Sequence, residues 1–170
     1  MNYFELFGWT PAFAIDKNEL RKRFFELSRQ YHPDYFAQAG ASEQADALER
    51  AAQLNKAYKV LGNDDERVRY VLELRGVLIA DEKYALAPDF LMEMMDLNEA
   101  LPEALADPEA KERLVTQLQN WKNDIYEPVA QILERGSEAA LPEKELLQVK
   151  EYYYRKKYLQ RLATALGQKL

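Results

Sequence analysis

Two side chains that can exchange protons stand two positions apart in this sequence: His32 and Asp34, in the segment Tyr31-His32-Pro33-Asp34. An imidazole and a carboxylate at this spacing could act as acid and base in a helical enzyme, or could bind a partner through hydrogen bonds. The enzyme hypothesis is weak, because nothing nearby offers a nucleophile, a metal cage or a glycine-rich phosphate loop. In a third interpretation the segment only ends a helix, since Pro33 restricts His32 to extended backbone.

The residues before this segment predict an amphipathic helix with a basic exposed side. Four residues form its apolar stripe: Leu20, Phe24, Leu27 and Tyr31. Residues 17–31 carry five basic and two acidic side chains, a local charge of +3 in a chain of net charge −6. Lys22 and Arg29 lie opposite the stripe. The pattern indicates that the helix binds an acidic partner by an attraction that salt would weaken.

The composition predicts an all-α fold and excludes several functions. The 170 residues include 6 Gly and 7 Pro, and strong helix formers dominate. A net charge of −6 argues against nucleic acid. The absence of cysteine and the single histidine exclude thiolate and histidine-rich metal sites, and no cofactor is expected. No apolar run is long enough to span a membrane, and we expect no signal peptide, so the cytoplasm is the expected compartment.

Helix-starting and helix-ending residues divide the chain. The expected helices cover residues 3–7, 16–31, 42–61, 64–74, 88–101, from 107 on, and from 142 to the C-terminus. Asp16 and Glu19 have capping-box spacing, Pro102 should stop one helix, and Pro128 should kink or break the next. We therefore expect one compact unit over residues 1–75, a linker over 76–87 and a three-helix bundle over 88–170.

The helix expected at residues 88–101 has two apolar faces instead of one. Its core stripe consists of Phe90, Met94, Leu97 and Leu101. Leu91, Met92 and Met95 fall on a second face, which Asp96 and Glu99 border. Methionine is flexible and common on adaptable binding surfaces, so this face either binds a partner or is covered by another helix of the bundle.

Three motifs in order resemble the J-domain of DnaJ-type co-chaperones. They are Tyr31-His32-Pro33-Asp34, the stretch from Leu54 to Leu61 (Leu-Asn-Lys-Ala-Tyr-Lys-Val-Leu), and Asp65-Glu66-Arg67. The resemblance implies that His32, Pro33 and Asp34, with the basic helix, bind a DnaK-type ATPase chaperone and stimulate its ATP hydrolysis. The nucleotide chemistry would then belong to the partner, and this protein would not be an enzyme.

One departure from that pattern concerns partner choice. J-domains often carry a Lys-Arg pair where this sequence has Phe25-Glu26. The basic contacts implied by the resemblance therefore rest on three residues: Arg21, Lys22 and Arg29. We expect partner choice to differ accordingly.

The rest of the chain narrows the resemblance to the HscB family of iron-sulfur cluster assembly. A general DnaJ would continue with a Gly/Phe-rich stretch and a cysteine zinc domain, and neither is present. The stretches 3–8, 67–76 and 88–95 resemble HscB, most strongly up to Leu101. The likeness implies an HscA-like ATPase partner and an IscU-like scaffold protein as client. The implied scaffold-binding residues are Leu91, Met92, Met95, Asp96, Glu99 and, on the last helix, Tyr158.

Two alternatives stay open from the sequence. Tyr158 belongs to a helix that also carries Tyr152, Tyr153 and Tyr154, and tyrosines at helical spacing are more often core than site. The protein could also be a generalist J-protein whose bundle binds many unfolded clients.

Overall fold

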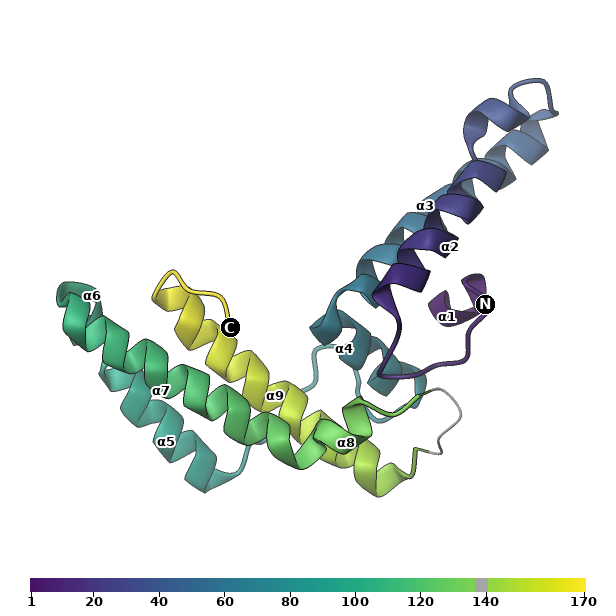
Figure 1. Ribbon diagram of the computed structural model, residues 1–170. Helices are drawn as coiled ribbons and strands as arrows, with labels where there is room; N and C mark the ends of the chain where they lie inside the picture. The colour runs from purple at the N-terminus through teal and green to yellow at the C-terminus, as the bar shows by residue number, and fades with distance from the viewer. Residues whose placement is uncertain (137–140) are drawn as a thin grey trace. The chain divides into compact units, whose positions relative to one another are not determined.

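The computed structural model describes residues 1–136 and 141–170, and every regular element in these residues is a helix (Figure 1). This confirms the predicted all-α class. The chain folds into two compact units, which we describe separately. The first consists of Met1–Leu74 and a short later segment that begins at Glu134, and the second contains Arg75–Leu133 and Leu141–Leu170. Within the described ranges, no helix combines the length and apolar character needed to cross a membrane.

The first unit is built on a pair of long antiparallel helices. Its elements are α1 (Tyr3–Leu6), α2 (Lys17–Gln30), the 3-10 helix η1 (Pro33–Phe36), α3 (Ala41–Gly62) and α4 (Asp64–Leu74). Helices α2 and α3 run side by side, and η1 lies in the loop that joins them (Figure 1). The segment Tyr31-His32-Pro33-Asp34 is therefore held at the end of a helical hairpin.

Capping explains most of the helix boundaries in this unit. The Asp16 carboxylate accepts hydrogen bonds from the backbone N–H groups of Asn18 and Glu19, at 2.9 and 3.1 Å. Glu19 does not complete a capping box, because its side chain pairs with Arg23 at 3.1 Å. Helix α3 begins at Ala41, so the prediction that Ser42 starts it was wrong by one residue.

A buried arginine joins three segments of the first unit. Arg67, on α4, is 7% exposed. Its guanidinium donates to the carbonyl oxygens of Phe13 and Leu61, both at 2.7 Å, and to the Asp64 carboxylate at 2.9 Å. Partial desolvation raises the pKa of Asp64, but hydrogen bonds from Lys17 and Arg67 outweigh it and hold that pKa below its ordinary value. Arg67 thus links the N-terminal loop, the end of α3 and α4.

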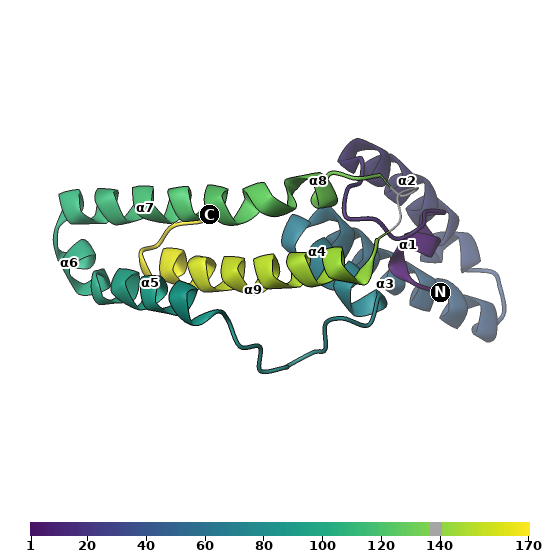
Figure 2. The ribbon, with the colours of Figure 1, turned by 90° about the horizontal axis from the view of Figure 1, so that it is seen from below.

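The second unit contains three long helices joined through short ones (Figure 2). Its elements are α5 (Pro88–Glu99), α6 (Leu101–Ala106), α7 (Pro108–Tyr126), the 3-10 helix η2 (Glu127–Val129), α8 (Ala130–Leu133) and α9 (Glu143–Ala165). Helix α9 packs against both α5 and α7.

Three prolines and a glycine decide where these helices start and stop. Pro108 begins α7 behind the Asp107 cap, and Pro128 breaks the helix into η2 and α8, as predicted. Helix α5 ends at Glu99, shortly before Pro102, as expected, but Pro102 also belongs to a second helix that the sequence did not predict. This proline lies in the first turn of α6, where the missing N–H costs no hydrogen bond. Helix α9 stops before the C-terminus, because Gly167 adopts a left-handed φ of 72°.

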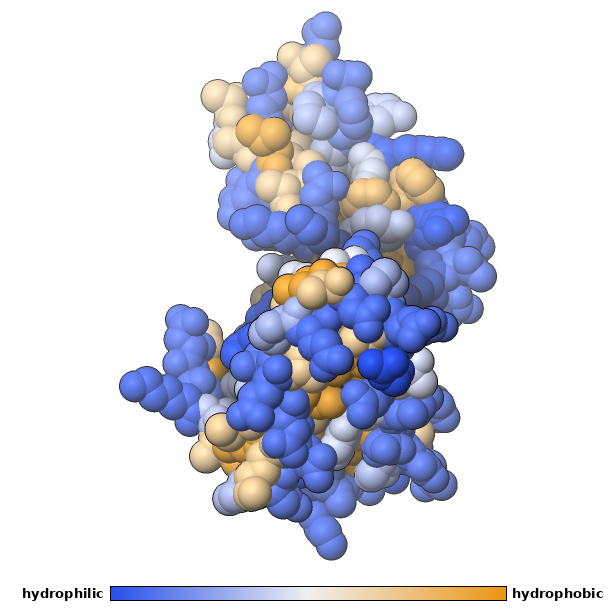
Figure 3. All heavy atoms as spheres, turned by 90° about the vertical axis from the view of Figure 1, so that its left-hand side faces the viewer, coloured by the Kyte–Doolittle hydropathy of each residue, from blue (hydrophilic) through white to orange (hydrophobic). Residues whose placement is uncertain are grey.

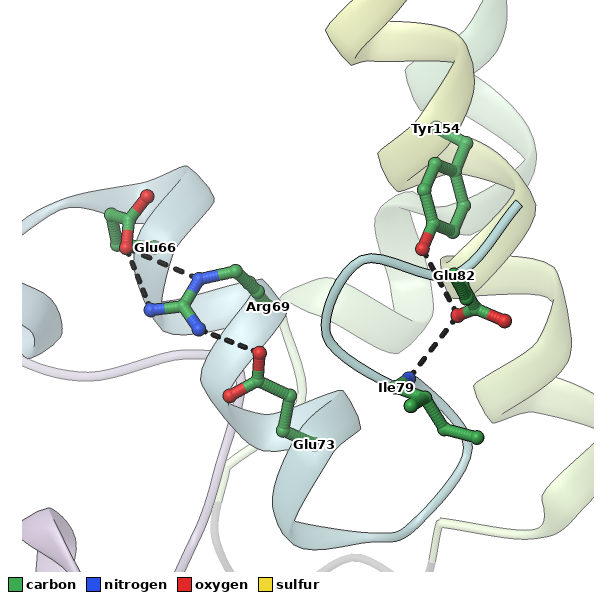
Figure 4. Close-up of polar contacts among 6 residues, drawn as sticks. All are labelled: Glu66, Arg69, Glu73, Ile79, Glu82 and Tyr154. Carbon is green, nitrogen blue, oxygen red and sulfur yellow. Dashed lines mark hydrogen bonds and ion pairs between the residues drawn. The ribbon is translucent and has the colours of Figure 1, made fainter. Parts of the chain in front are cut away.

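The segment expected as a linker, residues 76–87, is fastened to α9 (Figure 4). Lys150 donates to the carbonyl oxygen of Val77 at 2.6 Å and pairs with Glu82 at 3.0 Å. The Tyr154 hydroxyl donates to the same Glu82 carboxylate at 3.0 Å. The Tyr84 ring stacks on Tyr154, with centroids 4.4 Å apart. These contacts lie inside the second unit and fix the path of the segment there.

Acidification should release this segment from α9. Desolvation raises the pKa of Glu82, but hydrogen bonds from Lys150, the Ile79 N–H and Tyr154 outweigh it and lower that pKa below 4.5. A lowered folded-state pKa means that the stabilisation is complete above the ordinary pKa and is lost as the pH falls through the folded-state value. We expect the ring signals of Tyr154, which donates to Glu82, to shift only below about pH 4.5, measured by NMR with labelled tyrosine.

The control for this titration is Glu82→Gln, which removes the ion pair at every pH. Its Tyr154 signals should resemble those of acidified wild type already at neutral pH and should not respond to acid in this range, whereas Tyr84 is a poorer reporter because its hydroxyl donates to Glu151. Unchanged signals in Glu82→Gln would contradict the role given to this carboxylate.

Candidate functional site

The His-Pro-Asp loop (residues 31–34) is ordered by its own side chains. His32 has extended backbone, with φ −65° and ψ 133°, and its Nδ1 accepts the Asp34 N–H at 3.3 Å. His32 thereby caps η1, whose first residue is Pro33. His32 Nδ1 also lies 3.5 Å from the Asp34 carboxylate, so this nitrogen serves the loop itself and Nε2 is the ring nitrogen left for a partner. The Asp34 side chain is almost fully exposed, so its carboxylate can reach a partner in addition to His32.

A hollow of about 500 Å³ opens beside this loop, and we call it the loop hollow. Its lining combines charged, polar and aromatic side chains: Phe25, Ser28, Arg29, His32, Asp34 and Tyr35. Helix α2 contributes the first three residues, and the loop with η1 contributes the others. The structure therefore brings together Arg29, His32 and Asp34, three of the residues singled out in the sequence.

The basic side of α2 presents fewer available charges than the sequence indicated. Arg21, Lys22 and Arg29 are exposed, and in the part of the chain that the structure describes none of them forms an ion pair. Arg23 is committed to the fold: it pairs with Glu19, donates to the Phe7 carbonyl and lies over the Trp9 ring at 5.2 Å. The positive charge available to a partner thus comes from the three exposed residues.

Sequence reasoning missed Tyr35 as part of this site. Its ring is 72% exposed beside His32 and Asp34. The available signal was an aromatic residue directly after a motif that ends a helix, in a loop between two helices.

In the second unit, helix α5 separates its two apolar faces as the sequence indicated. Phe90, Met94 and Leu97 are buried in the bundle. On the second face, which we call the methionine face, Leu91 is half-buried, while Met92 and Met95 are 68% and 58% exposed. The alternative in which a bundle helix covers this face therefore does not fit the structure.

The charges that α5 itself carries beside the methionine face are all of one sign. Asp96 and Glu99 are exposed, as are Asp89 and Glu93, and α5 contains no basic residue. A view of the second unit from the side where α6 lies shows apolar patches set among hydrophilic surface (Figure 3). An apolar face on an acidic helix fits a partner surface that is apolar at its centre and basic around it.

The first turn of α5 is fixed by aromatic packing. The Phe90 ring meets Trp121 edge to face, with centroids 5.6 Å apart, and the Arg155 guanidinium lies 4.6 Å from the Phe90 centroid. Glu151 orients Arg155 through an ion pair at 2.9 Å. This packing holds the following residues of α5, including the methionine face, on a rigid support.

The tyrosines of α9 have different surroundings. Tyr152 and Tyr153 are buried in the core of the second unit, and Tyr154 holds the linker segment. Tyr158 is half-buried, one turn after Arg155, on the part of α9 that packs against α5. It therefore stays a candidate for the edge of the methionine face.

Two family models match consecutive parts of the chain. The DnaJ domain matches residues 2–70, and the HscB C-terminal oligomerisation domain matches residues 86–167. The first contains the loop hollow and the basic side of α2, and the second contains the methionine face and Tyr158.

Known proteins resemble the chain across both units. The co-chaperone protein HscB homolog of Vibrio vulnificus is 44% identical over 104 residues, which span only 61% of each chain. The homolog of Vibrio campbellii is 37% identical over 141 residues, 80% of this chain and 82% of the relative. The solved structure of HscB from Vibrio cholerae superimposes with a TM-score of 0.75 at 29% identity, covering 98% of this chain and 96% of that one. The chain belongs to the HscB family of J-domain co-chaperones.

Proposed function

We propose that this protein stimulates the ATPase of an HscA-like, DnaK-type chaperone and delivers an IscU-like scaffold protein to it, in support of iron-sulfur cluster maturation. The observation that carries the proposal is the exposed His-Pro-Asp loop beside the free charges of Arg21, Lys22 and Arg29. A loop fixed by its own hydrogen bonds loses little conformational entropy on binding, which favours a docking role over a mere helix end.

The loop hollow contains both hydrogen-bond donors and acceptors for the proposed partner. Arg29 is a donor and the Asp34 carboxylate is an acceptor, so the loop hollow can pair with both an acidic and a basic group of the ATPase. The basic side of α2 adds attraction at longer range, which raises the association rate at low salt. No bond is made or broken in this protein under the proposal, and ATP is hydrolysed by the partner.

Client delivery would depend on effective concentration. A single chain that binds the ATPase through one unit and the scaffold protein through the other makes their encounter intramolecular. If scaffold binding and ATP hydrolysis are also coupled, capture of the scaffold by the chaperone becomes tighter. The acidic surroundings of the methionine face support a folded client with basic residues around an apolar patch.

The ATPase role can be tested by steady-state hydrolysis with the purified HscA-like chaperone. We expect His32→Gln to lower stimulation at least about tenfold, because the variant loses the η1 cap and the imidazole ring that the proposed partner would contact. The matched control is Gln38→Ala, an exposed change in the same loop that lies outside the loop hollow. Full stimulation by His32→Gln would contradict the proposed function.

A further inference from the structure

We propose that Phe25 and Tyr35 form an apolar clamp that receives one apolar side chain of the DnaK-type partner, between the ionic contacts of Arg29 and Asp34. The proposal rests on the proposed function of the loop. It gives Phe25 a specific role in choosing the partner.

The first argument is the exposure of two large rings at one hollow. Phe25 is 57% exposed and Tyr35 is 72% exposed, and both line the loop hollow. The core does not need Phe25, because the adjacent Phe24 fills that place by stacking on Tyr58 of α3, with centroids 4.1 Å apart. Single exposed apolar residues are ordinary, but two aromatic rings on the walls of one hollow make a binding surface.

The second argument is the charge within the same hollow, which determines what can fill it. Arg29 offers a planar set of donors for a carboxylate, and Asp34 offers acceptors for a basic group. A purely apolar peptide would bury the Arg29 guanidinium without a partner and leave the Asp34 carboxylate only the His32 ring, and that carries a large desolvation cost. The hollow therefore fits a folded partner surface with an apolar side chain between an acidic and a basic one.

The third argument is the position of Phe25 in the J-domain pattern. It stands where the resemblance leads us to expect a basic residue, so an apolar contact replaces an ionic one at the edge of the proposed interface. Burial of a ring does not depend on ionic strength, whereas surface ion pairs do. The contact would favour a DnaK-type chaperone with an apolar residue at the facing position over one with an acidic residue there.

The test measures how much J-protein gives half-maximal stimulation of the purified HscA-like ATPase. Phe25→Gln and Tyr35→Gln should each raise that concentration about tenfold, the effect of losing most of one ring's burial. The matched control, Leu48→Gln, removes an apolar side chain that is 62% exposed on α3 and outside the hollow, and it should stay within about twofold of wild type.

The salt dependence of stimulation distinguishes the contribution of the apolar clamp from that of the charged residues around it. Between low and high salt, Phe25→Gln should show the same relative loss of stimulation as wild type, since the ring carries no charge. Arg29→Gln should show a smaller relative loss, because one screened contact is gone. A Phe25→Gln variant with altered salt dependence would contradict an apolar contact.

Three outcomes decide the proposal. If wild type stimulates the ATPase while Phe25→Gln and Tyr35→Gln match it, the clamp does not exist. If these variants lose binding of an unfolded model peptide but keep full stimulation, the hollow binds clients and the proposal is wrong. If wild type gives no stimulation, the proposed function itself fails, and the clamp fails with it.

Discussion

Replacing Arg67 by alanine is expected to lower the free energy of unfolding of the first unit by about 3–5 kcal/mol, because two buried carbonyl oxygens are left without a donor, at about 1–3 kcal/mol each. The change removes hydrogen bonds to the carbonyl oxygens of Phe13 and Leu61 and to Asp64. It also leaves a space where a 7% exposed side chain stood. Arg67→Lys should be intermediate, because an ammonium group cannot reach all three acceptors in the directions of the guanidinium.

The two tryptophans allow this measurement in the full-length protein. Trp9 lies in the first unit and Trp121 in the second, so a Trp121→Phe background leaves fluorescence that reports on the first unit alone. The matched control is Arg69→Ala on the same helix, where ion pairs with Glu66 and Glu73 lie near the surface (Figure 4). We expect that control to cost less than about 1 kcal/mol in urea unfolding. Equal costs for the two variants would contradict the structural role of Arg67.

The sequence predicted the parts of the fold that depend on local chemistry. The Asp16 cap, the proline start of α7 and the break at Pro128 follow from backbone hydrogen bonding and proline sterics within a few residues. At Pro102 the same reasoning correctly ended α5 close to the proline, at Glu99, but it missed α6, because a proline that cannot continue one helix can begin another.

The contacts that the sequence could not predict join residues far apart in the chain. Arg67 meets Phe13 across 54 positions, and Lys150 meets Glu82 across 68. The Asp65-Glu66-Arg67 motif resembled a family pattern, but nothing in its spacing indicated that the arginine is buried. Such pairs form because the folded chain brings them together, and a single sequence carries no periodic signal for them.

In the candidate sites, too, the sequence predicted the features that depend on one helix and missed the contacts between separate segments. Helical periodicity correctly assigned Met94 to the core and left Met92 and Met95 on a second face, because both assignments follow from one helix. Helical periodicity could not show that Arg23 contacts Trp9 and the N-terminal loop instead of a partner. It also could not show that Tyr35 lies beside His32. The functional roles of these residues stay predictions, and binding measurements must decide them.

Combined alanine substitution of Leu91, Met92 and Met95 is expected to weaken binding of the folded IscU-like scaffold protein about 100- to 1,000-fold, if each truncation costs about 1–1.5 kcal/mol. The physical reason is loss of the apolar centre of the proposed interface. Titration calorimetry with the purified scaffold protein measures the effect directly. Binding by wild type should also weaken with salt, since Asp96 and Glu99 border the face.

Two controls make this experiment specific. Leu105→Ala truncates a side chain that is 63% exposed on α6, so it tests whether any exposed leucine of the second unit matters. The double variant Met92→Ala, Met95→Ala leaves half-buried Leu91 in place and guards against a loss of binding caused by a disturbed α5. Circular dichroism should show wild-type helicity for all three proteins.

The identity of the ligand separates the specific adaptor from a generalist J-protein. A specific adaptor binds the folded scaffold tightly and an unfolded model peptide weakly, and the triple substitution affects mainly the first. A generalist binds the unfolded peptide at least as well, because flexible methionines adapt to many apolar sequences. Unchanged affinity of the triple variant for the folded scaffold would contradict the methionine face as the client site, since no other contact of that surface could replace three apolar side chains at its centre.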